Sequence, residues 1–179
     1  MSPLPQPDGP ALAIEISDGQ AHIPGIDRPR LAAIARRALM ASAVERAEVS
    51  IALVDNETIR AINSRHLGHD FATDVISFTL SDPGDSELSG ELIVSAEMAV
   101  EMAGRDGIEP FTELVLYVIH GLLHLLGLDD LTPPGAAEMR LREGELLAAE
   151  GLSHPFSPRR SEQEREADAS VRERTPWRV

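Results

Sequence analysis

A long apolar segment is the feature that most constrains how this chain can fold. Residues 111–127 read FTELVLYVIHGLLHLLG, and apolar side chains occupy nearly every position around a helix of this length. Such a helix is buried on most of its sides, because an exposed face would leave a large apolar surface in water. The rest of the chain must therefore pack around this segment, and Gly127 is a suitable residue to end the helix.

The length of 179 residues suits a single domain with one core. Hydrophobic periodicity runs through residues 11–155, which we expect to form the folded domain. The proline-rich residues 1–10 predict a disordered N-terminal lead. Residues 156–179 are dense in charge and poor in core-forming side chains, which predicts a charged, disordered tail that the fold does not need.

Strands and helices are interspersed along the predicted domain, which indicates an α+β fold with one main mixed sheet of about four strands packed with helices. Strands are predicted at residues 11–16, 48–55, 73–80 and 91–94, with a loop at 81–90. Besides the apolar helix, capping residues predict helices from Asp27, from Asp55 or Asn56, from Ser95 to Gly104 or Gly107, and from Thr132 to near Gly151.

Composition excludes several classes of function. The chain has no cysteine, so a transition-metal site would have to use His, Asp or Glu. The net charge of −14 argues against a protein that tracks long stretches of nucleic-acid backbone, and no DNA partner is expected. The sequence contains neither a secretory signal nor an 18-residue uncharged apolar stretch. We therefore expect a cytoplasmic protein that does not bind membranes.

Two histidines interrupt the apolar helix at a spacing that suits metal binding. His120 and His124 are four residues apart, so their side chains share one helix face. Gly127 permits a left-handed turn after them, which would bring Asp129 or Asp130 toward the same ion. Burying two imidazoles without partners would cost about 1–3 kcal/mol for each unsatisfied group. A His₂Asp metal site explains the pattern better than a purely structural helix does, and it leaves a coordination position for water.

The spacing of these residues matches that of metzincin zinc peptidases, whose ligands fall at positions one, five and eleven of their motif. His120, His124 and Asp130 occupy these positions, with Gly127 also in register. However, Gly121 stands where the peptidases have the glutamate that deprotonates water. A zinc peptidase is therefore the less favoured interpretation.

The sequence resembles the YbeY family of bacterial endoribonucleases and ribosomal RNA maturation factors. The family signature is approximately H-G-x-L-H-L-x-G-Y-D-H, and HGLLHLLGLDD stands at residues 120–130. TDVISF at 73–78 is similar to the family's T-D-V-L-S-F, and GELIVS at 90–95 is similar to its G-D-I-x-I-S. These motifs lie within residues 11–150, so the resemblance covers most of the chain.

This resemblance implies one zinc ion per chain, held by His120, His124 and Asp130. Most members have histidine in place of Asp130, and the added negative charge should make a bound water less acidic. The resemblance also implies an arginine that contacts substrate phosphate four residues after Asn63, where this chain has Leu67. Thr73, Asp74 and Ser77 match the family, and we interpret them as structural residues at the strand end rather than as catalytic ones.

The resemblance further implies a zinc-dependent, single-strand-specific endoribonuclease acting in ribosomal RNA maturation and ribosome quality control. Its expected partner is ribosomal RNA or the small ribosomal subunit, and water held by the metal is the expected nucleophile. No catalytic side chain is identified, and Arg65 and His66 are only weak candidates. The alternative is a ribosome-associated binding factor whose metal is structural. Within the predicted folded domain, the other candidates for phosphate contacts are Arg36, Arg37 and Arg60.

Overall fold

The computed structural model describes residues 11–154. The described part contains four strands and five helices in one sheet-and-helix assembly, as the sequence predicts. In chain order these elements are β1 (Ala11–Asp18), α1 (Arg28–Ala41), β2 (Arg46–Val54), α2 (Asn56–Leu67), β3 (Val75–Thr79), β4 (Leu88–Ser95), α3 (Ala96–Asp106), α4 (Pro110–Leu125) and α5 (Pro133–Ala149).

The four strands form one mixed sheet in the order β1-β2-β4-β3. β1, β2 and β4 are parallel, with Ile14 opposite Val49 and Val49 opposite Gly90. β3 is antiparallel to β4, with Ile76 opposite Ile93. The α+β class and the mixed sheet of about four strands are therefore confirmed.

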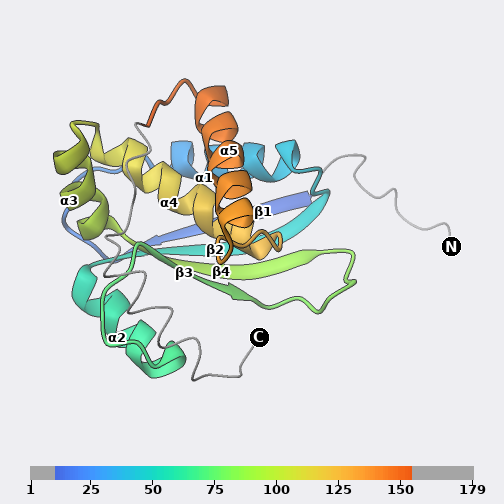
Figure 1. Ribbon diagram of the computed structural model, residues 1–179, viewed down its shortest axis with the longest axis horizontal. Helices are drawn as coiled ribbons and strands as arrows, with labels where there is room; N and C mark the ends of the chain where they lie inside the picture. The colour runs from blue at the N-terminus through green and yellow to red at the C-terminus, as the bar shows by residue number, and fades with distance from the viewer. Residues whose placement is uncertain (1–10, 155–179) are drawn as a thin grey trace, which may run out of the picture.

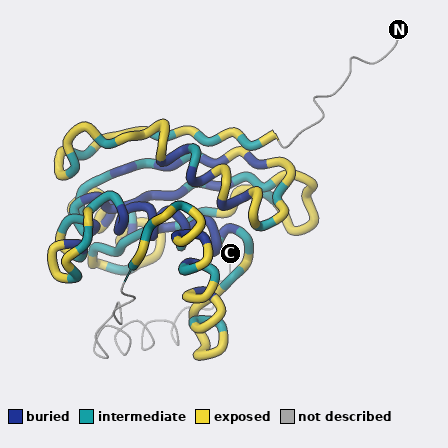
Figure 2. The backbone as a smooth tube through the Cα atoms, turned by 90° about the horizontal axis from the view of Figure 1, so that it is seen from above, coloured by how far each residue is buried: buried dark blue, intermediate teal, exposed yellow. Residues whose placement is uncertain are grey.

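The apolar helix α4 lies across one face of this sheet, as Figure 1 shows. α1 lies on the same side and α5 crosses over α4, whereas α2 lies on the opposite side of the sheet. Leu114, Leu116, Ile119 and Leu122 of α4 are at most 1% exposed. Figure 2 shows the same distribution, with buried residues along the inner strands and helices and exposed residues around the outside. The expectation that this helix is buried is confirmed.

A second, smaller apolar cluster lies on the α2 side of the sheet. Ile59 of α2 packs there with Ile76 of β3 and Ile93 of β4. Alternate residues of β3 point to opposite faces, so Val75 and Ser77 face α4 while Ile76 faces α2. The edge strand β3 thus connects the two layers and runs close to the end of α4.

Side chains cap four helices at the positions that the sequence predicts. Asp55, rather than Asn56, caps α2, and α3 continues past Gly104 to a left-handed Gly107. The capping oxygens of Asp27, Asp55, Ser95 and Thr132 accept hydrogen bonds from the backbone amides of Arg30, Thr58, Met98 and Gly135.

The predicted bounds of two strands were wrong. β3 is shorter than the predicted strand at 73–80, and β4 begins at Leu88 instead of at residue 91. Leu88, Ser89 and Gly90 carry turn-like local chemistry, but they pair with residues 47–49 of β2. This pairing involves a distant part of the chain, and local turn propensity therefore does not predict it.

The predicted N-terminal lead and the tail at 156–179 lie outside the described residues. Within residues 11–154, no helix has the length and apolar character needed to cross a membrane.

Candidate metal centre

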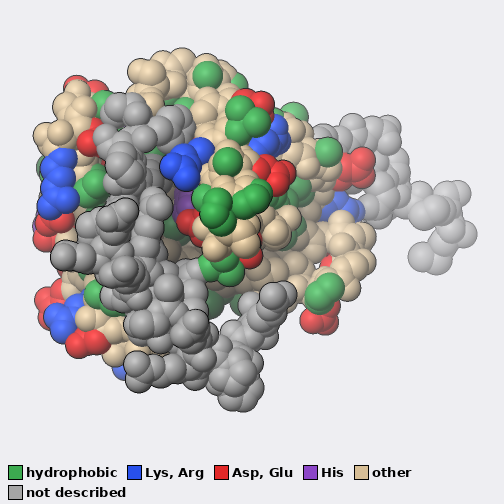
Figure 3. All heavy atoms as spheres, viewed as in Figure 1, with side chains coloured by type: hydrophobic (Ala, Val, Ile, Leu, Met, Phe, Trp, Pro, Cys, Tyr) green, Lys and Arg blue, Asp and Glu red, His purple; other side chains and the backbone are tan. Residues whose placement is uncertain are grey.

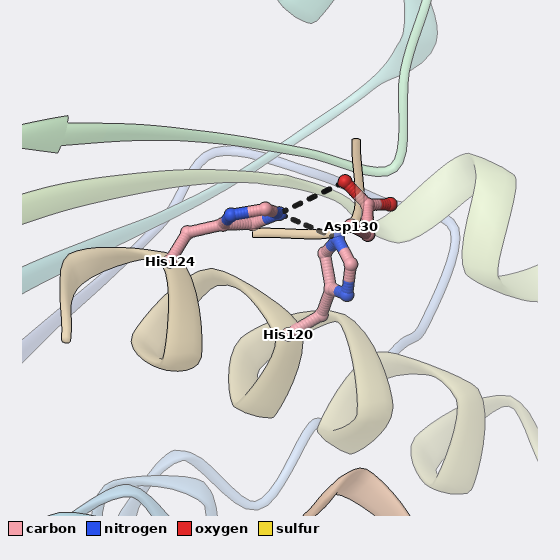
Figure 4. A group of neighbouring side chains, drawn as sticks. All are labelled: His120, His124 and Asp130. Atoms are coloured by element: carbon pink, nitrogen blue, oxygen red, sulfur yellow. Dashed lines mark hydrogen bonds and ion pairs between the residues drawn. The ribbon is translucent and has the colours of Figure 1, made fainter. Parts of the chain in front are cut away.

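The C-terminal turns of α4 bring the two predicted histidine ligands to the same side of the helix. The Nε2 atoms of His120 and His124 lie 2.9 Å apart, with the rings edge to face. Figure 4 shows both rings directed toward Asp130, which follows the helix. The ligand atoms of these three residues all lie within 4.8 Å of one another. The structure thus brings together the three residues that the sequence singled out.

Gly127 produces the turn that returns the chain to the histidines. Its φ of +89° is the left-handed conformation that the sequence predicts for this position. The backbone amide of Leu128 then donates to the carbonyl of Leu123 at 3.0 Å, which closes the end of α4. The segment after this turn brings the carboxylate of Asp130 beside the two imidazole rings, as Figure 4 shows.

The geometry distinguishes the two aspartates left open by the sequence. Asp130 Oδ1 lies 4.0 Å from Nε2 of His124. The carboxylate of Asp129 instead accepts a hydrogen bond from the backbone amide of Leu131, so it is engaged in the local turn. Asp130 is therefore the better placed third ligand.

The outer nitrogens of both histidines face hydrogen-bond acceptors. Nδ1 of His120 lies 2.6 Å from Oε1 of Glu143, and Nδ1 of His124 lies 3.0 Å from the carbonyl oxygen of Leu128. A carbonyl or carboxylate oxygen only accepts, so each Nδ1 carries the hydrogen. In the neutral imidazoles, both Nε2 lone pairs then point into the space shared with Asp130.

Two lone pairs at this distance require a cation between them, which is either a proton or a metal ion. Bonds of about 2.0–2.1 Å to one tetrahedral zinc would place two ligand atoms about 3.3 Å apart. The Nε2 atoms at 2.9 Å and the His124–Asp130 pair at 4.0 Å bracket this value, so movements of well under 1 Å would complete the site. The residues fit a zinc ion.

The two histidines differ in their electrostatic environment. Burial opposes the charged form of His120, but the hydrogen bond to Glu143 and the negative charges of Asp74, Glu143 and Asp130 outweigh burial and raise its pKa above the usual value. Burial and the neighbouring His120 lower the pKa of His124. These opposite shifts favour the proton between the two Nε2 atoms being bonded to His120 in the metal-free protein, with Nε2 of His124 accepting the hydrogen bond.

Glu143 is a residue of this centre that sequence reasoning missed. It comes from α5, its side chain is 3% exposed, and it contacts the histidine that lies deeper in the fold. A signal for it exists in the sequence, because Glu143 is the acid within the otherwise apolar stripe of Met139, Leu146 and Leu147. The acceptor for His124 is the backbone carbonyl of Leu128. Because every residue has such a carbonyl, the side-chain pattern of the sequence does not predict this contact.

The strand-end residues Thr73, Asp74 and Ser77 make hydrogen bonds next to the centre. Asp74 Oδ1 accepts hydrogen bonds from Thr73 Oγ1 at 2.9 Å and from the backbone amide of Val75 at 3.0 Å. Ser77 Oγ donates to the carbonyl of Gly121 at 3.2 Å and so ties β3 to α4. Asp74 also acts electrostatically on both histidines.

The two weak catalytic candidates lie on α2 and are not part of the three-residue group. His66 packs against Phe78 with ring centroids 5.8 Å apart, and Arg65 is exposed. Leu67, at the position where the family commonly has arginine, is 48% exposed.

Three other arginines considered for phosphate contacts are engaged elsewhere. Arg37 forms paired hydrogen bonds with Glu150, and Arg60 forms them with Asp70. Arg36 donates to the carbonyl of Leu12. On the face shown in Figure 3, basic and acidic side chains are interspersed among hydrophobic ones over the coloured part of the chain.

A second group of possible ligands lies toward the other end of α4. His154 forms an ion pair with Glu113, and its Nε2 lies 4.0 Å from Asp106 of α3. The His154 and Glu113 side chains are each 1% exposed. This cluster links the segment after α5 to α3 and α4.

The fold and the site together define an α+β domain with a candidate His₂Asp metal-binding group at the end of its central helix. Residues 15–151 match the family model described as endoribonuclease YbeY. The chain therefore belongs to the YbeY endoribonuclease family.

Individual relatives agree with this assignment. The chain is 36% identical over 157 residues to the endoribonuclease YbeY of Bacillus licheniformis, covering 80% of this chain and 98% of that protein. It is 42% identical over 116 residues to the Moorella thermoacetica endoribonuclease YbeY, covering 59% of this chain and 74% of the relative. A solution structure of a Thermotoga maritima protein matches with a TM-score of 0.52 at 23% identity, covering 80% of this chain and 99% of the other, which supports the fold.

Proposed function

We propose that this protein is a zinc-dependent, single-strand-specific endoribonuclease of the cytoplasm. We further propose that it acts on ribosomal RNA, free or in the small ribosomal subunit, during ribosomal RNA maturation and ribosome quality control. Family membership supports the endoribonuclease class. The metal dependence rests on the geometry of the site.

The observation that carries this proposal is the convergence of the two Nε2 atoms and the Asp130 carboxylate while both Nδ1 atoms are held by acceptors. A zinc ion held there would supply Lewis acidity to a phosphodiester and lower the pKa of a coordinated water toward about 7. His120 and His124 would hold the ion through their Nε2 atoms, and Asp130 would complete the set of protein ligands.

The packing of Gly121 argues against a zinc peptidase. A Cβ added at Gly121 would lie 2.9 Å from side-chain atoms of both Leu92 and Val75, because this position faces the sheet. A glutamate at this position would require the side chains of Leu92 and Val75 to shift. The chain lacks the glutamate base that the peptidase carries beside its first histidine, and its tight packing at Gly121 suits glycine.

One observation favours the alternative of a ribosome-associated binding factor with a structural metal. The exposed Leu67 replaces the arginine common in the family, and the guanidinium groups of Arg37 and Arg60 are paired with carboxylates. Loss of a phosphate contact would weaken catalysis more directly than it would weaken metal binding. Whether the purified protein cleaves RNA without any partner distinguishes the two functions.

The test is a cleavage assay with one RNA sequence in single-stranded form and in a duplex with its complement. We expect the zinc-loaded protein to cut the single strand, to cut the duplex far more slowly, and to lose both activities when a chelator removes the metal. The His22→Ala variant is the control, since His22 lies outside the three-residue group. Stoichiometric zinc without cleavage of either RNA would favour the binding factor.

A further inference from the structure

Glu143 is an acid in the middle of the buried face of α5. The residue as a whole is 2% exposed, and Met139 and Leu147 on the same face are each 1% exposed. Removing a carboxylate from water costs several kcal/mol unless a partner compensates for the loss. An apolar residue would dock this face of α5 against α4 equally well, so helix packing alone does not account for Glu143.

The partner of this carboxylate is His120. The distance of 2.6 Å between Oε1 and Nδ1 is that of a strong, charge-assisted hydrogen bond. Because the carboxylate accepts, the hydrogen stays on Nδ1, and the lone pair of Nε2 is directed toward His124 and Asp130. The contact thereby fixes both the tautomer and the orientation of the ring.

The two histidines are held in unequal ways. His124 donates to a neutral carbonyl, that of Leu128, at 3.0 Å, whereas His120 faces a full negative charge at a shorter distance. A carboxylate on the outer nitrogen makes an imidazole the more basic ligand.

We propose that Glu143 is a positioning residue of the metal centre, which holds His120 in its ligating tautomer and strengthens its bond to the ion. The proposal rests on the proposed metal site, but it concerns a residue of α5 that does not itself touch the ion. It assigns to α5 a role in metal affinity in addition to packing against α4.

The test compares the zinc affinities of folded Glu143→Gln and Glu143→Leu with that of the wild type by competition with a chromogenic chelator. We expect a loss of about tenfold for Glu143→Gln, which keeps an acceptor but not the charge, and of up to about 100-fold for Glu143→Leu. Glu145→Gln is the matched control, since Glu145 lies on the same helix, is half exposed and pairs with Arg142. It should bind zinc as the wild type does.

A purely structural role predicts a different pattern, in which the metal-free variants lose stability while the folded fraction binds zinc normally. Wild-type affinity in the nearly isosteric Glu143→Gln would overturn the proposal, even if Glu143→Leu failed to fold. If the wild-type protein bound no zinc, the proposed function would fail, and the ring ¹⁵N resonances of His120 would still test Glu143. A hydrogen that stays fixed on Nδ1 in metal-free Glu143→Leu would overturn the positioning role.

Discussion

His120 and His124 approach each other through their Nε2 atoms, 2.9 Å apart, while their Nδ1 atoms point to different acceptors on α5 and on the loop after α4. Two separate parts of the chain, α5 and the loop after α4, therefore determine the orientation of the two rings. This arrangement leaves only the Nε2 lone pairs available in the shared space, and it makes the centre sensitive to changes in either part.

Replacing His124 by alanine should release the metal and lower the melting temperature of protein purified with zinc. An ion that binds only the folded state stabilises it by about 2.7 kcal/mol when its free concentration is 100 times its dissociation constant. Elemental analysis and calorimetry measure both effects. The His22→Ala control should change neither, and equal metal content in the His124→Ala variant would contradict the assignment.

The pair of adjacent aspartates permits a matched comparison. Asp130→Asn should weaken zinc binding strongly, whereas Asp129→Asn should keep the metal, because the Asp129 side chain serves the backbone of the turn. Asp130→His should retain zinc, since imidazole is an equally good ligand. Isothermal titration with zinc provides the three affinities. Loss of zinc in Asp129→Asn together with its retention in Asp130→Asn would identify Asp129 as the ligand.

Gly127 should be required both for stability and for the site. Gly127→Ala is expected to lower the free energy of unfolding by about 1–2 kcal/mol, because φ is +89° there. A Cβ at this position meets nothing within 4 Å, so the cost is one of backbone conformation alone. Zinc affinity should fall as well, since this turn places Asp130.

The control for this change is Gly104→Ala, in the interior of α3, where a Cβ also meets nothing within 4 Å. It should stabilise the protein by about 0.5–1 kcal/mol and leave zinc affinity unchanged. Chemical denaturation of the metal-free variants measures both values. Equal effects of the two substitutions on the free energy of unfolding and on zinc affinity would show that neither depends on the left-handed turn at Gly127.

A pH effect is expected from the ion pair between α1 and the end of α5. Arg37 donates to both carboxylate oxygens of Glu150 at 2.6 Å, and this hydrogen bonding lowers the pKa of Glu150. Since the folded pKa lies below the unfolded value, the stabilisation is complete above the unfolded pKa of about 4.3. It is then lost as the pH falls through the folded pKa.

Glu150→Gln should therefore destabilise the protein by no more than about 1 kcal/mol near neutral pH and by less at about pH 3. Urea denaturation at the two pH values measures the difference. The same destabilisation at both would show that the lost contribution is packing rather than charge.

Among the arginines of the folded domain, Arg65 is the one to test for contact with RNA. It is exposed on the last turn of α2, and its side chain makes no hydrogen bond or ion pair with the described residues, whereas Arg60 pairs with Asp70. Arg65→Ala should weaken binding of single-stranded RNA and reduce the slope of log affinity against log salt by about 0.7, the value for one lost phosphate contact. Arg60→Ala should change the slope less, because Asp70 already holds that guanidinium. An unchanged slope in both variants would exclude Arg65 from the RNA-binding surface.

The parts of the fold that local chemistry determines could be predicted from the sequence. The apolar periodicity of α4, the capping side chains and the left-handed Gly127 all depend on residues a few positions apart, and the histidine pair follows from helical spacing. Pairing between distant segments was harder to predict. The start of β4 depends on β2, and Glu143 reaches His120 only because α5 crosses α4. The choice of Asp130 over Asp129 required the path of the loop itself.

The central claim is that two imidazoles and one carboxylate of this chain hold one zinc ion. X-ray absorption spectroscopy of the zinc-loaded protein at the zinc edge measures this coordination shell directly. The structure predicts two imidazole nitrogens at about 2.0–2.1 Å and a carboxylate oxygen at about 2.0–2.2 Å, with the remaining position filled by water. A shell without imidazole scattering, or protein that retains no zinc, would contradict it.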